Sequence, residues 1–271
     1  MCDEEGQSPL YIASEEGECD VVKCLLSSGA DINLCDEDGQ SPLFITSKEG
    51  KCDVVNCLLS SGANINLCDE NGQSPLYIAS KEGECDVVKC LLSSGADINW
   101  CDKRGKSPLF IASKEGECDV VKCLLSSGAE ITLWDKWRQS PLFAASMSGQ
   151  YDVVKCLLSS GADINVCDED GQFPLFIASW KGKCDDVKRL LSSGTNINLC
   201  DKDGESPLFA ASGHEECDVV KCLLSSGADI NLSGKWGQSP LFIALMYGCC
   251  DIVKWLLGSG ADINFCDNIG Q

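Results

Sequence analysis

Eight prolines recur at a constant interval of 33 residues along the chain, at Pro9, Pro42, Pro75, Pro108, Pro141, Pro174, Pro207 and Pro240. A fixed period of this length is typical of a repeat protein, in which one supersecondary unit is copied and stacked on its neighbours. We therefore predict a single array over residues 1–271 without an internal linker. Most recurring residues should serve stacking. Function is expected in the variable columns, a column being the set of equivalent positions in successive copies.

In the copy at residues 36–68, a turn precedes a short helix. Asp38-Gly39 predicts a tight turn, because glycine accepts a positive φ. Ser41-Pro42 predicts a helix start, since serine caps free N–H groups and proline is tolerated at the first helical position. The apolar and small residues that follow would form the buried face of this helix, which we expect to end near Gly50.

A second helix is predicted to begin around Asp53, whose carboxylate suits the positive N-terminus of a helix. Apolar residues then recur at helical spacing, namely Val54, Val55, Leu58 and Leu59. Gly62 should end the helix in the left-handed conformation, and its column is glycine in all eight copies. Each copy thus predicts a turn followed by two short antiparallel helices.

Three sequence blocks carry a resemblance to a known family. D-x-x-G-x-S-P-L-F-I-A-S, G-E-C-D-V-V-K-C-L-L and S-G-A-D-I-N are similar to the blocks D-x-x-G-x-T-P-L-H-x-A-A, G-x-x-E-V-V-K-x-L-L and x-G-A-D-V-N of the ankyrin repeat. The resemblance implies an all-α ankyrin-repeat solenoid of helix-turn-helix repeats joined by β-turn fingers. The repeats would span about residues 3–35, 36–68, 69–101, 102–134, 135–167, 168–200, 201–233 and 234–266. The chain stops at Gly270-Gln271, halfway into a further finger, as a fragment of a longer array would.

Several residues depart from the family pattern. An aromatic ring replaces the family's histidine in every repeat, and we expect ring packing to replace its hydrogen bonds; the residues are Tyr11, Phe44, Tyr77, Phe110, Phe143, Phe176, Phe209 and Phe242. Arg138 stands at the finger glycine of repeat five, and Phe173 replaces the capping serine of repeat six. Repeat seven has an altered interhelix turn, Gly213-His214-Glu215. We predict that repeats five to seven are the less stable half of the array.

Charge limits the possible partners. The formal net charge is −21, which disfavours nucleic acid and anionic membranes, because basic patches supply affinity for both. Residues 1–100 hold nineteen acidic and five basic side chains, whereas residues 101–271 hold twenty-three and sixteen. The first residues, Met-Cys-Asp-Glu-Glu, lack the apolar stretch of a signal peptide. A cytoplasmic or nuclear location is the expectation.

The 21 cysteines fall in columns instead of metal-ligand clusters. The first column holds Cys19, Cys52, Cys85, Cys118, Cys184, Cys217 and Cys250; the second holds Cys24, Cys57, Cys90, Cys123, Cys156 and Cys222; the third holds Cys2, Cys35, Cys68, Cys101, Cys167, Cys200 and Cys266, with Cys249 left over. Their spacing matches no usual zinc pattern, and the chain has one histidine. We predict reduced, mostly buried thiols acting as small hydrophobes, with no metal and no cofactor.

The resemblance implies a concave binding face made of finger tips and the exposed side of each first helix. These columns carry mostly Glu, Asp, Gln and Lys in the first three repeats and diversify from the fourth. Exposed Trp, Met, Tyr and Arg are typical interface anchors, so we predict a partner site at Lys103, Arg104, Lys106, Lys136, Trp137, Met147, Trp180, Lys181, Lys202, His214, Lys235, Trp236, Met246 and Tyr247. Trp255 is expected in the core, while Trp100 and Trp134 could be core or surface.

The first functional hypothesis is a monomeric, non-catalytic scaffold or adaptor for a protein or peptide with acidic and apolar residues. An enzyme is disfavoured, because His214 is the only imidazole and neither a phosphate-binding nor a dinucleotide-binding glycine motif is present. Two alternatives stay open. The chain could be the repeat portion of a larger protein whose activity lies elsewhere, or a thiol-rich protein with a redox or metal-buffering role.

Overall fold

The computed structural model describes residues 3 and 5–264. Cys2, Cys266 and Gly270-Gln271, to which some predictions refer, lie outside these residues. The described part of the chain forms sixteen α-helices and no β-strand, two helices for each predicted repeat. The prediction of an all-α helix-pair architecture is therefore confirmed.

Packing divides the chain into two compact units. Unit 1 comprises Met1–Lys136 and unit 2 comprises Trp137–Gln271. The helices of unit 1 are α1 (Pro9–Glu16), α2 (Cys19–Ser27), α3 (Pro42–Lys48), α4 (Cys52–Ser60), α5 (Pro75–Lys81), α6 (Cys85–Ser93), α7 (Pro108–Glu115) and α8 (Cys118–Ser126). Those of unit 2 are α9 (Pro141–Ser148), α10 (Tyr151–Ser159), α11 (Pro174–Trp180), α12 (Cys184–Ser192), α13 (Pro207–Gly213), α14 (Cys217–Ser225), α15 (Pro240–Met246) and α16 (Cys250–Gly258).

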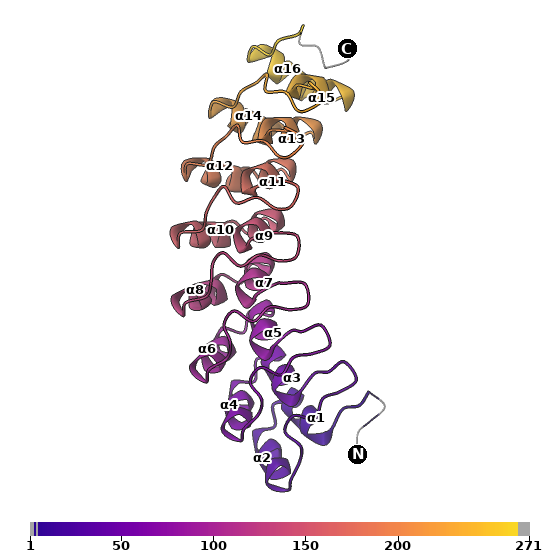
Figure 1. Cartoon of the computed structure of the whole chain (residues 1–271), viewed down its shortest axis with the longest axis vertical. Helices are drawn as coiled ribbons and strands as arrows, with labels where there is room; N and C mark the ends of the chain where they lie inside the picture. Colours follow the sequence, from indigo (N-terminus) through magenta and orange to yellow (C-terminus); the bar gives the residue numbers. More distant parts are fainter. Residues whose placement is uncertain (1–2, 4, 265–271) are drawn as a thin grey trace. The chain divides into compact units, whose positions relative to one another are not determined.

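Within each unit, the first helices of successive repeats pack on one another, and the second helices form a parallel row (Figure 1). The apolar stripe predicted for the second helix lies in the core: Val54, Val55 and Leu58 are buried, and Leu59 is half-buried. Because each helix pair buries its apolar face against its neighbours, stability comes from stacking.

The Ser-Pro pairs begin the first helices as predicted. In each of seven repeats, the serine Oγ accepts a hydrogen bond from the backbone N–H three residues later, at 3.1–3.2 Å. In repeat six the cap position holds Phe173, which makes no such bond. Its ring is buried and lies edge-on to Phe176, with ring centroids 6.3 Å apart. One capping interaction is thus exchanged for aromatic packing.

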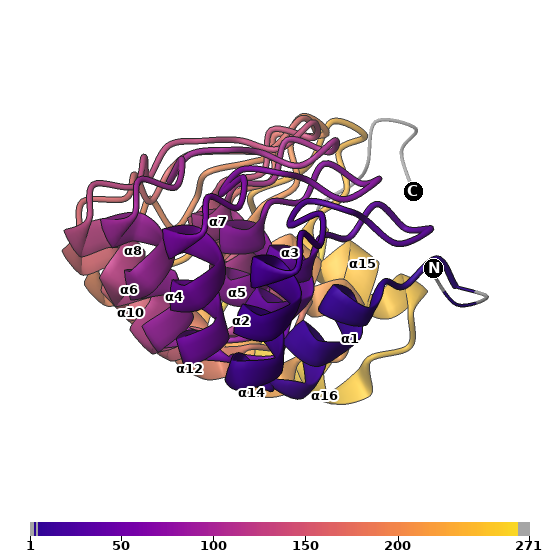
Figure 2. The same cartoon turned by 90° about the horizontal axis from the view of Figure 1, so that it is seen from below.

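The fingers between repeats are turns held by an aspartate. Asp36 Oδ1 accepts from the backbone N–H groups of Asp38 and Gln40, at 3.1 and 2.8 Å. The Glu70 N–H at the next finger tip donates to the Asp38 carbonyl at 3.0 Å. In each unit the fingers lie along one side of the helices (Figure 2). These bonds hold each turn together and join successive finger tips.

Two non-glycine residues occupy left-handed backbone positions. Arg138 and Glu215 both have φ of +60°. The corresponding residues Gly105 and Gly182, one repeat earlier, have φ of +80° and +69°. The interhelix turn of repeat seven therefore keeps a left-handed residue, but its backbone is altered just before it: His214 has φ of −118° and ψ of 20°, whereas the equivalent Lys181 has −86° and 0°.

The expectation of mostly buried cysteines is wrong. Among the described cysteines only Cys249 is buried; Cys24 and Cys250 are exposed and the others are half-buried. The reason is geometric, because the buried stripe of most second helices is formed by Val and Leu. Trp255, predicted in the core, is likewise 48% exposed. It occupies a cysteine column of the last described repeat, and the Lys221 ammonium lies 4.9 Å from its ring centroid.

Candidate partner-binding site

The predicted site residues occupy two kinds of position. Lys103, Arg104, Lys106, Lys136, Trp137, Lys202, Lys235 and Trp236 lie in fingers, and Met147, Trp180, Lys181, His214, Met246 and Tyr247 lie at the ends of first helices. All are exposed except Lys106 and Trp180, which are half-buried. The helix-end residues belong to two columns, those of Lys81 and Glu82, which we call the helix-end columns.

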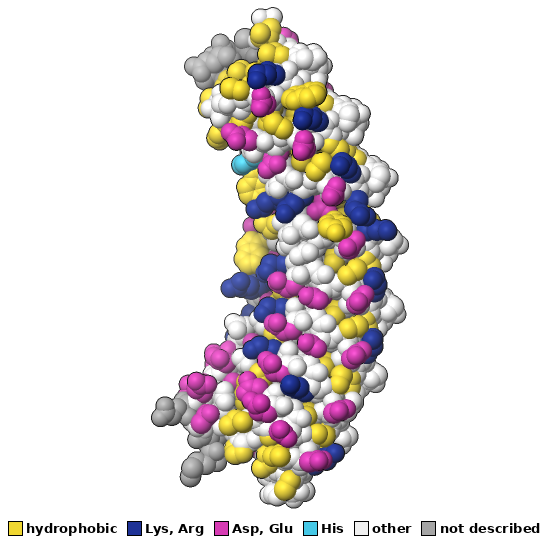
Figure 3. Space-filling model, turned by 180° about the vertical axis from the view of Figure 1, so that it is seen from behind, with side chains coloured by type: hydrophobic (Ala, Val, Ile, Leu, Met, Phe, Trp, Pro, Cys, Tyr) yellow, Lys and Arg dark blue, Asp and Glu magenta, His cyan; other side chains and the backbone are white. Residues whose placement is uncertain are grey.

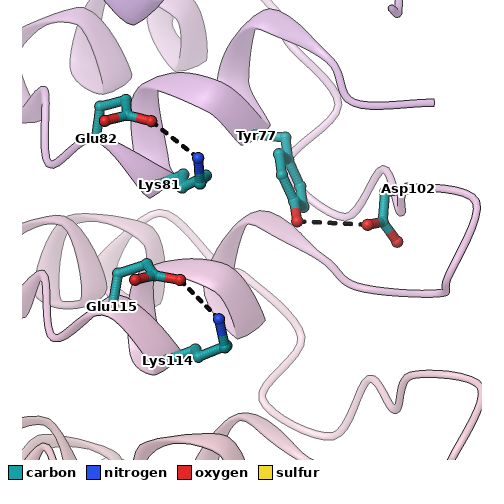
Figure 4. A network of polar contacts seen from close by, with 6 residues as sticks. All are labelled: Tyr77, Lys81, Glu82, Asp102, Lys114 and Glu115. Atoms are coloured by element: carbon teal, nitrogen blue, oxygen red, sulfur yellow. Dashed lines mark hydrogen bonds and ion pairs between the residues drawn. The ribbon is translucent and has the colours of Figure 1, made fainter. Parts of the chain in front are cut away.

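In unit 1 the helix-end columns are charged in every repeat. Their residues are Glu15, Lys48, Lys81 and Lys114 in one column and Glu16, Glu49, Glu82 and Glu115 in the other. Lys81 pairs with Glu82 at 3.1 Å, and Lys114 pairs with Glu115 at 2.9 Å (Figure 4). Exposed ion pairs of this kind contribute little stability, so this surface of unit 1 is an ordinary solvated one.

Tyrosine hydroxyls join first helices to fingers in unit 1. Tyr77 Oη donates to Asp102 Oδ2 at 3.3 Å (Figure 4), and Tyr11 Oη donates to Gln40 Oε1 at 3.4 Å. Burial and then the Asp102 carboxylate raise the pKa of Tyr77, which keeps its hydroxyl protonated as a donor. The expected replacement of hydrogen bonds by ring packing is therefore wrong for these two tyrosines.

In unit 2 the helix-end columns no longer contain lysine–glutamate pairs. One column carries Met147, Trp180, Gly213 and Met246, and the other carries Ser148, Lys181, His214 and Tyr247. Four of these residues, Trp180, Gly213, His214 and Tyr247, line a depression of about 320 Å³ together with residues of the neighbouring first helices and fingers. Its residues are Gln172, Phe176, Trp180, Glu205, Phe209, Ala210, Gly213, His214, Ile243 and Tyr247. We call this depression the Trp180 pocket.

Trp180 is held on two sides within the pocket. Its indole Nε1–H donates to His214 Nε2, and the two rings meet edge to face with centroids 5.4 Å apart. The Lys181 ammonium lies 4.3 Å from the Trp180 ring centroid, a cation–π contact. The indole is therefore positioned by its neighbours while remaining half-buried at the surface. A preoriented aromatic side chain is well suited to anchoring a partner.

Glu205 is the one carboxylate that lines the Trp180 pocket. Burial and then the Asp201 and Asp203 charges raise its pKa. Its column is glutamine in most other repeats, including Gln172, which also lines the pocket. That departure was visible in the sequence, but Glu205 was not among the predicted residues. Phe176 and Phe209 were recognised only as packing residues.

The structure groups three of the predicted residues, Trp180, His214 and Tyr247, in one pocket. Met246 instead lines a separate depression of about 400 Å³ with Phe242, Leu245 and Ile263. The predicted site residues on fingers do not line the Trp180 pocket. Among them, Trp236 is 62% exposed, and the Lys235 ammonium lies 5.6 Å from its ring centroid.

The basic finger residues of unit 1 form a second group. Lys103 and Lys136 are at successive finger tips, where their backbone N–H groups each donate at 2.9 Å to the preceding finger. The Lys106 ammonium lies 5.4 Å from the Phe110 ring centroid. Around the first repeats, in the lower part of Figure 3, Asp and Glu side chains outnumber basic ones, in line with the charge of residues 1–100. The surface thus becomes more basic from the fourth repeat.

Among the described residues, no group of three or more His, Cys, Asp or Glu side chains is arranged to hold a metal ion. None of the described helices has the length and apolar character needed to cross a membrane. Trp100 and Trp134, which the sequence left undecided, are 42% and 44% exposed. Trp100 Nε1–H donates to the Gly72 carbonyl at 3.3 Å, so it supports a finger stem.

Comparison with known families agrees with the helix-pair architecture. The family described as "Ankyrin repeats (3 copies)" matches residues 1–69, 43–135, 76–168, 133–199 and 175–267. No curated protein matched the chain. Ankyrin repeats generally mediate protein–protein interactions and are typically non-catalytic. The family matches extend over residues 1–267, and the chain therefore belongs to the ankyrin repeat family.

Proposed function

We propose that the chain is a non-catalytic scaffold or adaptor that binds a protein or peptide at the Trp180 pocket, on the finger and first-helix face of repeats six to eight. One observation carries the proposal. The columns that hold the Lys81–Glu82 and Lys114–Glu115 pairs in unit 1 hold Trp180, His214 and Tyr247 in repeats six to eight, and these three rings line one pocket. Exposed anchors around a pocket are typical of interfaces.

The composition of the pocket and its surroundings indicates the chemistry of the partner. The rings of Phe176, Trp180 and Phe209 would receive an apolar side chain. Lys181, Lys202 and Lys235 lie exposed on the same repeats, so acidic residues flanking that side chain would be favoured. The remaining predicted residues on the fingers of unit 2 would extend this contact. A net charge of −21 disfavours nucleic acid and anionic membranes as partners.

The test replaces Trp180 and Lys181 by the residues found at the equivalent positions of repeat three in unit 1. The double variant Trp180→Lys, Lys181→Glu installs the residues of the Lys81–Glu82 pair, which the same fold accommodates in repeat three. Wild type and variant would be used for affinity capture from native extract. The binding of any recovered protein would then be measured with purified components by calorimetry. We expect Kd to rise at least about tenfold, which corresponds to about 1.4 kcal/mol.

Trp255→Cys provides the matched control. It removes an exposed tryptophan from a second helix and restores the residue most frequent in that column. Circular dichroism would confirm that both variants remain helical. Equal affinity of the wild type and the Trp180 double variant for the recovered protein would contradict the proposed site. A partner whose binding depends on Trp255 would place the interface on the second helices instead.

The proposal includes a monomer, located in the cytoplasm or nucleus, without enzymatic activity. A repeat portion of a larger protein could bind in the same way, so that alternative is compatible with the Trp180 pocket. The thiol-based alternative would act through the cysteine columns, which the Trp180 double variant leaves intact. Free-thiol and metal analyses of the purified protein would distinguish it from the scaffold.

A further inference from the structure

The Trp180 pocket contains a carboxylate that no described cation neutralises. Glu205 lines the pocket and is half-buried. None of the ion pairs among the described residues includes its carboxylate. Burial and then the Asp201 and Asp203 charges raise its pKa. A cationic group that entered the pocket would therefore meet a carboxylate that is still without a counter-charge.

The column of Glu205 shows that a cation fits beside the neighbouring ring. In the other repeats the column holds glutamine or lysine, namely Gln7, Gln40, Gln73, Lys106, Gln139, Gln172 and Gln238. In repeat four the Lys106 ammonium lies 5.4 Å from the ring centroid of Phe110, in the first helix of the same repeat. Phe209 is the equivalent ring in repeat seven and lines the Trp180 pocket. Repeat seven thus combines the same kind of ring with a carboxylate instead of a cation.

Two glycines leave space in the pocket and beside Glu205. Gly213 lines the pocket in a column where the other repeats carry Glu, Lys, Met or Trp, and a Cβ atom there would lie 3.2 Å from Ile243 Cγ1. Gly234 replaces an aspartate that the other seven repeats share, and a Cβ atom there would lie 3.6 Å from Glu205 Cγ. The first glycine keeps the pocket open, and the second removes a side chain and a negative charge from the side of Glu205.

We propose that the Trp180 pocket binds an arginine side chain of the partner, whose guanidinium pairs with Glu205. The inference rests on the proposed function and specifies the side chain that the pocket receives. Arginine suits both parts of the pocket, because its aliphatic stem packs on apolar surface while its planar guanidinium stacks on aromatic rings and donates two parallel hydrogen bonds to a carboxylate. Phe176, Trp180 and Phe209 would contact the stem. The volume of about 320 Å³ suits a single side chain.

The charges inside and outside the pocket differ in sign. Glu205 lines the pocket, whereas Lys181 contacts the Trp180 ring at 4.3 Å without lining it. Lys202 and Lys235 are likewise exposed outside the pocket. A partner with one arginine between acidic residues would complement both regions. A segment that is acidic throughout would leave Glu205 without a counter-charge and should bind more weakly.

Two synthetic pentapeptides test the inference. One has a central arginine between aspartates, and the other has citrulline, the neutral isostere of arginine, at the same place. The isotope-labelled full-length chain would be titrated with each peptide at pH 7, and the indole N–H signal of Trp180 would be followed by NMR. This signal is identified by its absence from the spectrum of Trp180→Phe. We expect the arginine peptide to shift it with a Kd at least about tenfold lower than that of the citrulline peptide.

Glu205→Gln should remove the preference for arginine, and it installs the residue most frequent in its column, so the fold accommodates it. Glu169→Gln, the matched control, removes an equal charge from an exposed finger position outside the pocket and should keep the preference. A preference lost equally in both variants would indicate general attraction to an acidic chain and would overturn the inference.

Equal Kd values of the two peptides for the wild type would also overturn it, while leaving the pocket as a site for an apolar side chain. A Trp180 signal that neither peptide shifts would count against arginine as well. The proposed function is tested separately, because the capture experiment with the Trp180 double variant uses neither peptide. Failure of the arginine inference and failure of the binding site are therefore distinguishable.

Discussion

Glu215 shows how a single residue with a strained backbone can lower the stability of its repeat. Its φ of +60° lies in the left-handed region, where a side chain is strained and glycine is not. The column is glycine in the other seven repeats. We expect Glu215→Gly to raise the free energy of unfolding by about 0.5–1 kcal/mol. This gain is the backbone strain that the substitution relieves minus the conformational entropy that glycine adds to the unfolded chain.

Urea denaturation would measure this gain as a higher midpoint at constant slope. Glu216→Gly is the matched control, because Glu216 has φ of −84° and gains nothing from glycine. An unchanged or lower midpoint for Glu215→Gly would contradict the strain argument. Arg138→Gly should behave in the same direction, since Arg138 also has φ of +60°.

Asp186 is a buried carboxyl in a column of valine and isoleucine. It is 2% exposed, and its Oδ1 has no hydrogen-bond partner among the described residues. Burial raises its pKa from 3.8 to about 6, a rise that the nearby Lys183 and Arg189 charges oppose and the Asp185 charge adds to. A carboxylate without enough polar partners is costly in such a place.

The direction of the pH effect follows from linkage. Because the folded pKa is the higher one, the folded state retains the proton more strongly between pH 3.8 and about 6. The stability contribution of Asp186 is therefore fully present below pH 3.8 and is lost as pH rises through about 6. At pH 7 the folded chain has lost about 3 kcal/mol of stability through Asp186, because each unit between the two pKa values costs about 1.4 kcal/mol.

Asp186→Val should therefore stabilise the chain more at pH 7 than at pH 4. The measurement is the difference in unfolding free energy between variant and wild type at both pH values, which cancels the titration of the other acidic groups. Asp185→Asn, at an exposed position of the same helix, should show no comparable increase with pH. A variant whose advantage is equal at both pH values would refute the raised pKa.

At the scale of the element, Phe173 sets two effects against each other at the start of α11. A serine there would regain a capping hydrogen bond, worth about 1 kcal/mol. It would also remove a fully buried ring, and loss of such a ring costs about 3–5 kcal/mol. Since the packing loss is larger, Phe173→Ser should destabilise the chain by about 2 kcal/mol or more, measured by chemical denaturation.

Phe173→Leu serves as the matched comparison, because it keeps an apolar side chain and still lacks the cap. It should lose less stability than Phe173→Ser. If Phe173→Ser were instead as stable as wild type, the cap would offset the loss of the ring, and the aromatic packing with Phe176 would be worth only about 1 kcal/mol. The ranking of the three chains therefore separates capping from packing.

Helix positions were predictable because their signals are local. Ser41-Pro42 and Gly62 mark α3 and α4 through capping and left-handed geometry, which depend on adjacent residues only. The candidate site was predictable in part: column variation identified Trp180 and His214, but their mutual contact depends on the stacking of α11 and α13. The exposure of Trp255 and of the cysteines was missed for the same reason, since residue type alone does not specify which side of a helix its neighbours cover.

At the scale of the whole molecule, the local defects of unit 2 fall in adjacent repeats. Arg138, Asp186 and Glu215 belong to repeats five, six and seven, respectively. In a repeat array, stability is approximately a sum of repeat and nearest-neighbour contributions, so adjacent defects lower the cost of opening the same region. We therefore expect amide hydrogens of α10, α12 and α14 to exchange faster than those of α4 and α6.

Native-state hydrogen exchange with mass spectrometry measures this difference directly. About 1.4 kcal/mol of lost local stability corresponds to a tenfold faster exchange when opening is at equilibrium. The triple variant Arg138→Gly, Asp186→Val, Glu215→Gly should restore protection in α10, α12 and α14, while α4 and α6 change less. Asp185→Asn, outside the buried stripe, should leave the pattern as it is. Uniform protection along the wild-type chain would mean that neighbouring interfaces compensate each defect, and the array would then have to open as one cooperative unit.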